Sequence, residues 1–219
     1  MTTRKLFAVL AISSLTLAAD LVVAAQSNPS AQTPVGQTAI VTAQANQVID
    51  FWKQAGPAMW FAKDAEFDRQ FREKFLALHD AAMRGELQHW ETSTDETLAL
   101  LLLLDQFPRN AFRDTPRMYA SDGLARKIAK AAIDKGFDRE VPAELRLFMY
   151  LPLGHSEDLG DQERAVALVR GLGEPNLSHA MGHRDIIKRF DRFPHRNPIL
   201  GRKMKFEEQK FLDEGGFAG

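Results

Sequence analysis

The stretch Leu98–Leu104, with the sequence LALLLLL, decides the fold because it is apolar on every side of a helix. Ser93 and Glu96 precede it with the spacing of a capping box, and Pro108 follows it, so the pattern predicts a helix between Ser93 and Pro108. A helix without a polar face is stable only where neighbouring elements cover it on all sides. The sequence therefore predicts that this helix lies in the middle of a helical domain.

Helical periodicity continues on both sides of this central segment. Val48, Phe51 and Trp52 follow an i, i+3, i+4 pattern, and no stretch alternates apolar and polar residues for long enough to predict a strand. Asp64 is expected to cap one further helix and Gly136 to end another. The further helices are expected over residues 64–85, 121–135, 142–151, 161–172, 178–191 and 206–212. About eight helices joined by short loops predict an all-α fold with antiparallel helix packing.

Residues 1–25 have the features of an export signal. Arg4 and Lys5 precede a 14-residue apolar run, and the small residues that end at Ala25 suit cleavage by a signal peptidase. Asp20 is unusual in a signal and also argues against a membrane-spanning helix. We therefore expect a periplasmic or secreted mature protein without a membrane span, and an uncleaved N-terminal membrane anchor is the alternative.

The rest of the chain divides into a linker and one domain. Residues 26–45 carry no charge and are rich in Ser, Thr, Gln, Ala and Pro, which predicts a disordered linker before a single helical domain over residues 46–219. The 219-residue chain has a formal net charge of −1, which gives no general argument for binding nucleic acid. It has no Cys, which excludes disulfides, thiolate nucleophiles and zinc sites built on Cys.

The first polar segment, residues 105–110, follows the leucine-rich helix directly. It presents Asp105, Gln106, Arg109 and Asn110 at the end of that helix. These side chains either cap the helix, with Arg109 bonded to its last carbonyls, or form a fixed polar cluster at the mouth of a cleft.

The second polar segment, residues 155–158, follows the apolar residues that end at Gly154. Ser156 or Asp158 is expected to cap the next helix. Alternatively, His155 with Glu157 and Asp158 has the groups needed for proton transfer or for holding a hard metal ion. Four adjacent residues cannot all face one point, so such a site needs partners from elsewhere in the chain.

The third polar segment, residues 189–202, is the most basic part of the sequence. Eight Lys or Arg stand against two Asp between residues 181 and 205. Prolines stiffen the segment, and guanidinium groups held in place bind carboxylates and phosphates well. A solvated basic face, or a structural network with the acids of the other two segments, explains the same pattern without a ligand.

The candidate residues come from all three polar segments. The candidate ligand-binding residues are Asp105, Gln106, Arg109, Asn110, Arg192, Arg196, Asn197 and Arg202. The weaker catalytic candidates are His155, Glu157, Asp158 and His195. His183 is on the apolar stripe of its helix and is expected to be a hydrogen-bonded, half-buried residue, and the sequence predicts no metal site.

Four stretches of the sequence resemble the signatures of a bacterial domain-of-unknown-function family, number 924. They are residues 60–61, 103–110, 150–158 and 192–202, within a similarity that covers about residues 46–217. The resemblance implies an all-helical, tetratricopeptide-like array and no particular activity. Asp191 stands where relatives usually have Gly.

Two functions of different classes follow from these residues. The first is a binding module that holds a small anionic ligand or a peptide carboxylate in a cleft lined by Arg, His and Asn. The alternative is a hydrolase of phosphate or carboxylate esters, in which His155 or His195 moves protons while Glu157 and Asp158 orient them or hold a metal. Nucleic acid is not an expected partner, because the basic stretch is short. Both functions require that the three polar segments meet in one place.

Overall fold

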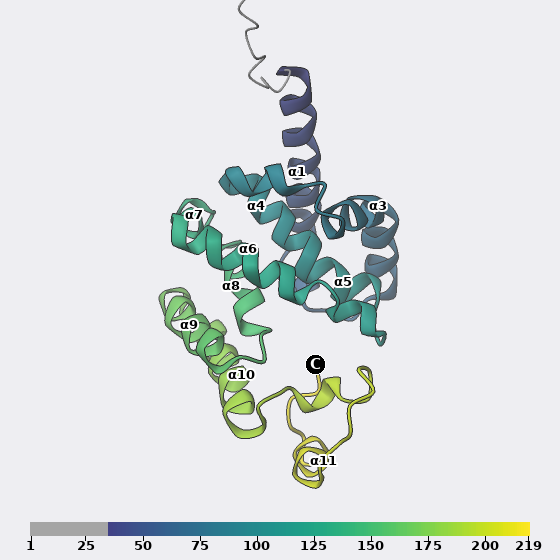
Figure 1. The fold of residues 1–219 in the computed structure, drawn as a ribbon, viewed down its shortest axis with the longest axis vertical. Coiled ribbons are helices and arrows are strands. Elements are labelled where there is room, and N and C mark those ends of the chain that lie inside the picture. The colour runs from purple at the N-terminus through teal and green to yellow at the C-terminus, as the bar shows by residue number, and fades with distance from the viewer. Residues whose placement is uncertain (1–34) are drawn as a thin grey trace, which may run out of the picture. The chain divides into compact units, whose positions relative to one another are not determined.

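The computed structural model of the protein describes residues 35–219, in which every regular element is a helix (Figure 1). The all-α class predicted from the sequence is confirmed. The predicted export signal, residues 1–25, lies outside the described residues, as do residues 26–34. None of the helices described is both long and apolar enough to cross a membrane.

The number of helices is close to the predicted eight, since eight of the α-helices between residues 35 and 219 have eight residues or more. Short 3₁₀ turns at Gln88–Thr92, Pro116–Tyr119, Arg170–Leu172 and Pro194–Arg196 join some of them. The α-helices are α1 (Val35–Ala55), α2 (Pro57–Trp60), α3 (Ala65–Met83), α4 (Thr94–Leu101), α5 (Phe107–Ala111), α6 (Asp122–Lys135), α7 (Phe137–Glu140), α8 (Leu147–Gly154), α9 (Leu159–Val169), α10 (Asn176–Phe190) and α11 (Phe206–Asp213).

The leucine-rich segment is the centre of the main core, as predicted. Every residue of Leu98–Leu104 is buried, and α1, α6 and α8 pack against α4. The helix nevertheless continues through Pro108, which corrects the expected end. A wider π-helical turn, Leu102–Gln106, joins α4 to α5, and the N–H of Phe107 donates to the carbonyl of Leu102.

Side chains from distant parts of the chain make this continuation through Pro108 possible. A proline has no N–H to donate to the carbonyl four residues earlier, which is Leu104. The Ser121 hydroxyl donates to that oxygen at 2.5 Å, and Nδ1 of His79 lies 2.9 Å from the carbonyl of Leu103. The backbone oxygens that the π turn and Pro108 leave free are therefore satisfied.

Most predicted helix starts and stops are observed, with three further corrections. Asp64 caps α3 and Gly136 ends α6 in the left-handed conformation, as expected. The Ser93 capping box is not formed, because the Ser93 hydroxyl donates to the Glu96 carboxylate at 2.9 Å.

The other two corrections concern α1 and α8. Helix α1 begins at Val35, inside the stretch expected as a linker, and buries Ala45 completely against the core. Helix α8 begins at Leu147 instead of Pro142, because the Arg146 guanidinium donates to the carbonyls of Arg139 and Val141 and holds the preceding turn.

A second, smaller core lies at the end of α10. Ile186, Ile187, Phe190 and Phe193 are buried together, with Phe211 of α11 packed against them. Helix α10 ends at Asp191, whose φ of 59° is left-handed, and glycine adopts this conformation without strain. The turn brings the third polar segment back toward α5, α6 and α8 (Figure 1).

Candidate functional site

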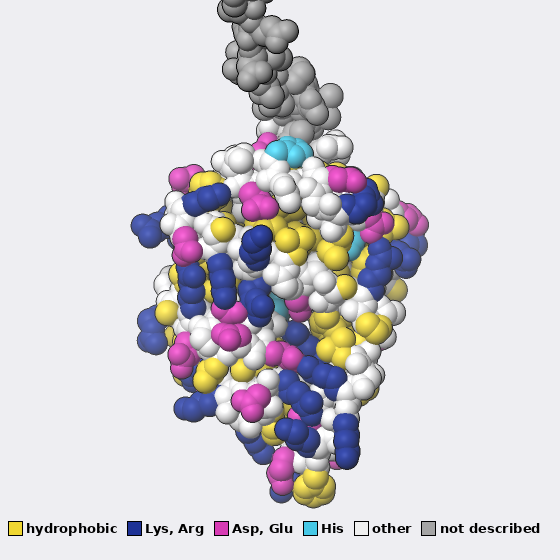
Figure 2. Space-filling view, viewed as in Figure 1, with side chains coloured by type: hydrophobic (Ala, Val, Ile, Leu, Met, Phe, Trp, Pro, Cys, Tyr) yellow, Lys and Arg dark blue, Asp and Glu magenta, His cyan; other side chains and the backbone are white. Residues whose placement is uncertain are grey.

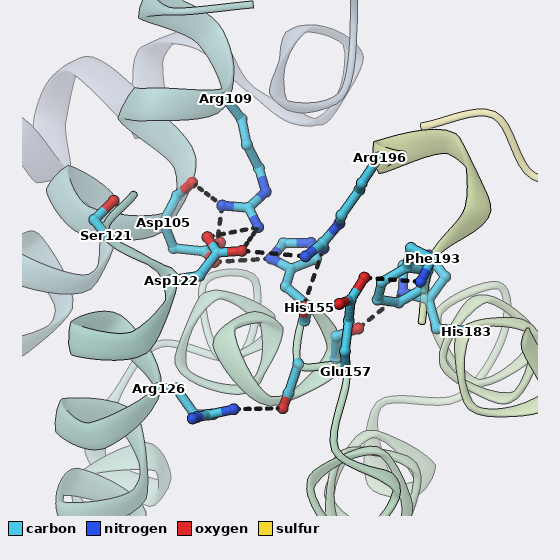
Figure 3. A network of polar contacts seen from close by, with 12 residues as sticks. Asp105, Arg109, Ser121, Asp122, Arg126, His155, Glu157, His183, Phe193 and Arg196 are labelled. Atoms are coloured by element: carbon cyan, nitrogen blue, oxygen red, sulfur yellow. Dashed lines mark hydrogen bonds and ion pairs between the residues drawn. The ribbon is translucent and has the colours of Figure 1, made fainter. Parts of the chain in front are cut away.

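The three polar segments meet in the folded chain (Figure 3). Nδ1 of His155 lies 2.8 Å from Oδ1 of Asp105, which joins the second segment to the first. The Arg196 guanidinium donates to the backbone oxygen of His155 at 3.0 Å, which joins the third segment to the second. The convergence on which both predicted functions depend is therefore present.

Asp105 is the buried anchor of this cluster. It lies on the π-helical turn with 1% of its side chain exposed and accepts hydrogen bonds from His155 and from the amide of Gln106. Burial alone raises the pKa of Asp105. The charge of Arg109 and these hydrogen bonds lower it by more than burial raises it, so the pKa is about 2. Asp105 is therefore an ionised carboxylate at neutral pH.

His155, at the C-terminal end of α8, is held in one tautomer. An ionised carboxylate only accepts hydrogen bonds, so the ring proton of His155 lies on Nδ1 facing Asp105. Burial and the nearby charge of Arg109 lower the pKa of His155 below its usual value, so the ring is neutral at pH 7. Its Nε2 makes no hydrogen bond with any residue the structure describes.

Two arginines and one further aspartate surround this pair. Arg109, on α5, donates to the backbone oxygen of Asp105 at 2.7 Å and forms an ion pair with Asp122 of α6 at 3.0 Å. Arg196 is 8% exposed and reaches Asp122 only at 3.4 Å, while its Nε is buried without a partner. Its guanidinium lies between the rings of Tyr119 and Phe193, at 4.6 and 4.5 Å from their centroids. Arg196 is therefore tightly positioned, with hydrogen-bonding capacity to spare.

A cavity of about 460 Å³ opens beside this cluster. Its polar end includes Gln106, Arg109, Asn110, His155 and Arg196, all of which are sequence-predicted candidates. Its other walls are mostly apolar and come from α2, α8, α9 and α10, including Trp60, Leu151, Val169 and Ala180. Such a cavity is suited to a molecule with one polar end and an apolar body.

Two further histidines and the C-terminal tail lie at the same cavity. Burial, with the charge of Arg196, lowers the pKa of His195 to about 3, and burial lowers that of His183 to about 4. His183 lies 3.2 Å from the Gly154 carbonyl and is half-buried, as predicted. The Phe217 ring packs against both, with centroids 5.1 Å from His195 and 4.7 Å from His183.

The remaining candidates lie outside the cavity lining, in a separate network. Glu208 of α11 is fully buried and accepts hydrogen bonds from Arg192 at 2.6 Å and from Asn197 at 3.1 Å. Arg202 pairs with Glu157 at 2.6 Å. On the face seen in Figure 2, Lys and Arg side chains are mixed with Asp and Glu toward the end where α11 lies. Much of the basic third segment thus neutralises acids of the same chain.

The two carboxylates of the second segment also have partners within the chain. Glu157 accepts the backbone N–H of Phe193 at 2.8 Å as well as Arg202, and Asp158 caps α9 by accepting from the N–H of Asp161. Neither carboxylate lines the cavity of about 460 Å³, although Glu157 lines a second, more open one of about 330 Å³ together with His155 and Arg196. In the described part of the chain, no three His, Asp or Glu side chains are grouped as a metal would require.

Sequence reasoning missed Asp122, Tyr119 and Phe217. Asp122 stands in the first turn of α6, where an acidic residue is ordinary. Tyr119 and Phe217 lie in a short 3₁₀ turn and in the tail, without any periodic pattern around them. Only the fold shows that these three lie beside Arg196 and His195.

The comparisons with known proteins bear on the identity of this domain. The sequence model of a family described as "Bacterial protein of unknown function (DUF924)" matches residues 48–216. The chain belongs to this family. This DUF924 protein is also similar to a solved structure, a protein of unknown function from Agrobacterium tumefaciens. The two sequences are 52% identical over 80% of this chain and 99% of the other, with a TM-score of 0.78. None of the curated proteins is similar to the chain.

Proposed function

We propose that the domain binds a small organic anion, with a carboxylate at Arg196 and an apolar body along the cavity wall. The spare hydrogen-bonding capacity of Arg196 is the observation that carries the proposal. A guanidinium has five N–H donors, and Arg196 uses one toward the His155 carbonyl and one, at 3.4 Å, toward Asp122. A carboxylate accepts from two parallel donors of such a fork.

The surroundings of Arg196 support a carboxylate with an apolar body. The cluster holds two guanidiniums, Arg109 and Arg196, against the two carboxylates Asp105 and Asp122, so a bound anion meets no excess of negative charge. The volume of about 460 Å³ lies within the usual range for small-molecule sites, and Trp60 and Leu151 line its apolar side.

The tail supports the same proposal for a peptide carboxylate. Phe217 and Gly219 line the cavity, so a peptide segment already lies along its wall. A free carboxylate and the end of a peptide share the group that Arg196 would recognise. Titration with hexanoate and with a short peptide ending in a free carboxylate distinguishes the two sources.

Binding is tested by the thermal unfolding and Trp fluorescence of the full chain with hexanoate, and with hexanol as the uncharged control. We expect hexanoate to raise the melting temperature, because a ligand at about 100 times its Kd adds about 2.7 kcal/mol to the free energy of unfolding. Arg196→Gln should abolish this response, while Arg170→Gln, at an exposed position, should keep it. An unresponsive wild-type chain, or equal responses of the two variants, overturns the proposal.

Export places this binding activity in the periplasm or outside the cell, as part of the same proposal. It is supported by the positive start, the apolar run and the small residues before position 26. N-terminal sequencing of the protein from fractionated cells tests it, and a mature chain that begins near residue 26 is the expected result. A full-length chain in the cytosol would contradict it.

A further inference from the structure

The binding of an anion leaves one feature of the site unused, the pair formed by Asp105 and His155. The Asp105 carboxylate is 1% exposed and lies 2.8 Å from Nδ1 of His155, so it fixes both the orientation and the tautomer of the ring. A buried carboxylate on one nitrogen of an imidazole makes the other nitrogen a better base, because it stabilises the cation that forms on protonation. Histidines that only fill space do not need this arrangement.

The second ring nitrogen is the one available for chemistry. His155 lines the cavity, its side chain is 15% exposed, and Nε2 has no hydrogen-bond partner in the described part of the chain. It lies on the opposite side of the ring from Asp105, so its lone pair is free to accept a proton. His155 therefore has the position of a general base.

The two guanidiniums lie where negative charge would develop. Arg196 donates to the backbone oxygen of His155, and Arg109 donates to that of Asp105, so both lie next to the base (Figure 3). Buried cationic donors of this kind stabilise the oxyanion of a tetrahedral intermediate. An acyl group with an apolar chain would have its carbonyl oxygen at Arg196 and its chain along Trp60 and Leu151.

The residues described around the cavity include no Ser, Thr or Cys. Tyr119 and Tyr150 have hydroxyl groups, but burial raises the pKa of both and makes them poor nucleophiles, and the Tyr150 hydroxyl already donates to Asp138. The attacking group is then water, which a neutral imidazole can activate.

From this arrangement we infer that His155, positioned by Asp105, is the general base of an esterase that hydrolyses carboxylic esters with an apolar acyl chain. The inference rests on the proposed function, because the carboxylate that binds at Arg196 is the acid product of this reaction.

The reaction consumes one water per ester. Nε2 of His155 takes a proton from water as the water oxygen attacks the acyl carbon, and the carbonyl oxygen becomes an oxyanion facing Arg196. The intermediate then collapses, the bond from the acyl carbon to the alkoxy oxygen breaks, and His155 returns its proton to the departing alcohol. The products are the alcohol and the carboxylic acid, which releases its proton to solvent. His155 is the catalytic residue, and Asp105 is a positioning residue.

The test uses the full chain with phenyl hexanoate, and chromatography of the released phenol measures turnover at any pH. We expect His155→Gln to lower kcat by about 100-fold or more, as is usual for the loss of a general base. Exposed histidines also hydrolyse activated esters slowly, so His89→Gln, at an exposed position, serves as the matched control and should keep the wild-type rate. Turnover that is no faster than buffer, or that His155→Gln retains, overturns the inference.

Asp105→Asn separates positioning from folding. If Asp105 acts through His155, this variant lowers kcat while KM for the ester and the affinity for hexanoate stay within about twofold. A parallel loss of hexanoate affinity and melting temperature assigns Asp105 to folding alone and overturns its positioning role.

The pH profile of the wild-type chain needs no variant. A general base must be neutral, so the rate should rise with pH to a plateau, with a midpoint below the ordinary imidazole pKa of about 6.5. A midpoint at or above the ordinary imidazole pKa, or a rate that falls as the pH rises toward 7, overturns the inference. The charged and titratable groups that face His155 are Asp105, Arg109, Asp122, His183, His195 and Arg196.

The outcomes also separate this inference from the proposed function. Binding of hexanoate without turnover of the ester overturns the esterase and leaves the anion site. Turnover without inhibition by hexanoate overturns the anion site at Arg196. If the chain shows no binding of hexanoate and no turnover of the ester, both the proposed function and this inference are overturned.

Discussion

Replacing Glu208 with Ala removes the carboxylate on which the end of the third polar segment depends. Glu208 is fully buried and accepts hydrogen bonds from Nε and Nη2 of Arg192, from the amide of Asn197 and from the backbone N–H of Lys205, at 2.6 to 3.1 Å. Removing one partner of a buried ion pair costs about 3–5 kcal/mol. Arg192 is 21% exposed and regains contact with water, whereas Asn197 is completely buried and loses an acceptor. We therefore expect a loss of about 3–4 kcal/mol.

Urea unfolding followed by circular dichroism measures this loss. Glu207→Ala is the matched control, because Glu207 is the neighbouring residue on α11 and is exposed, so its removal should change the free energy of unfolding by less than about 0.5 kcal/mol. Helix α11 belongs to the smaller core, so part of the effect can appear as local opening. Hydrogen exchange over residues 192–213 detects that part.

One result refutes this account of the network. If Glu208→Ala and Glu207→Ala unfold at the same urea concentration, with equal hydrogen exchange over residues 192–213, then Glu208 does not hold Arg192 and Asn197 in place. Those two side chains would then be free to bind a ligand, as the sequence alone predicts.

Three further predictions follow from other parts of the structure. His183 and His195 have pKa values of about 4 and about 3, below the ordinary 6.5, so the unfolded chain binds protons that the folded chain does not. The contribution of the two neutral rings to the free energy of unfolding is complete above pH 6.5. Urea unfolding should show the free energy of unfolding falling by about 1.4 kcal/mol per pH unit for each histidine between pH 6.5 and 4. A free energy of unfolding that does not change over this range contradicts their burial as neutral rings. Asp191→Gly should raise the free energy of unfolding by about 0.5–1 kcal/mol, because φ at this residue is 59°, and a loss in the same urea assay would contradict the argument from backbone strain. Phe217→Ala removes a ring contact worth about 1 kcal/mol from the cavity lining, and should raise the affinity for hexanoate about fivefold in a fluorescence titration if the tail competes with the ligand. A weaker affinity would instead make Phe217 part of the binding wall.

Local signals in the sequence were sufficient for most of the fold. Leu98–Leu104 has one stable location, the middle of a helical domain, because no side of it can face water. Asp64 and Gly136 set helix ends through interactions within a few residues, and these predictions are confirmed. Pro108 did not end its helix, because the compensating donors come from His79 and Ser121, and no local pattern shows their approach.

The candidate site was predictable in composition but not in arrangement. His155 and Arg196 were identified because polar residues that directly follow apolar helices stand out in the sequence. Arg192 and Arg202 have the same local pattern as Arg196, yet Glu208 and Glu157 neutralise them, and Arg196 lies at the cavity. A pattern of charges does not specify which guanidinium meets which carboxylate.

The sequence by itself determined the all-helical class, the central leucine-rich helix and the residues able to carry polar chemistry, because these depend on side-chain type and on spacing along one helix. Only the tertiary structure decided that Asp105, His155 and Arg196 meet at one end of an apolar cavity. These residues come from helices far apart in the chain, and the packing of the whole core sets the distances between them. That packing also decides which arginines are neutralised within the chain and which retain donors for a ligand.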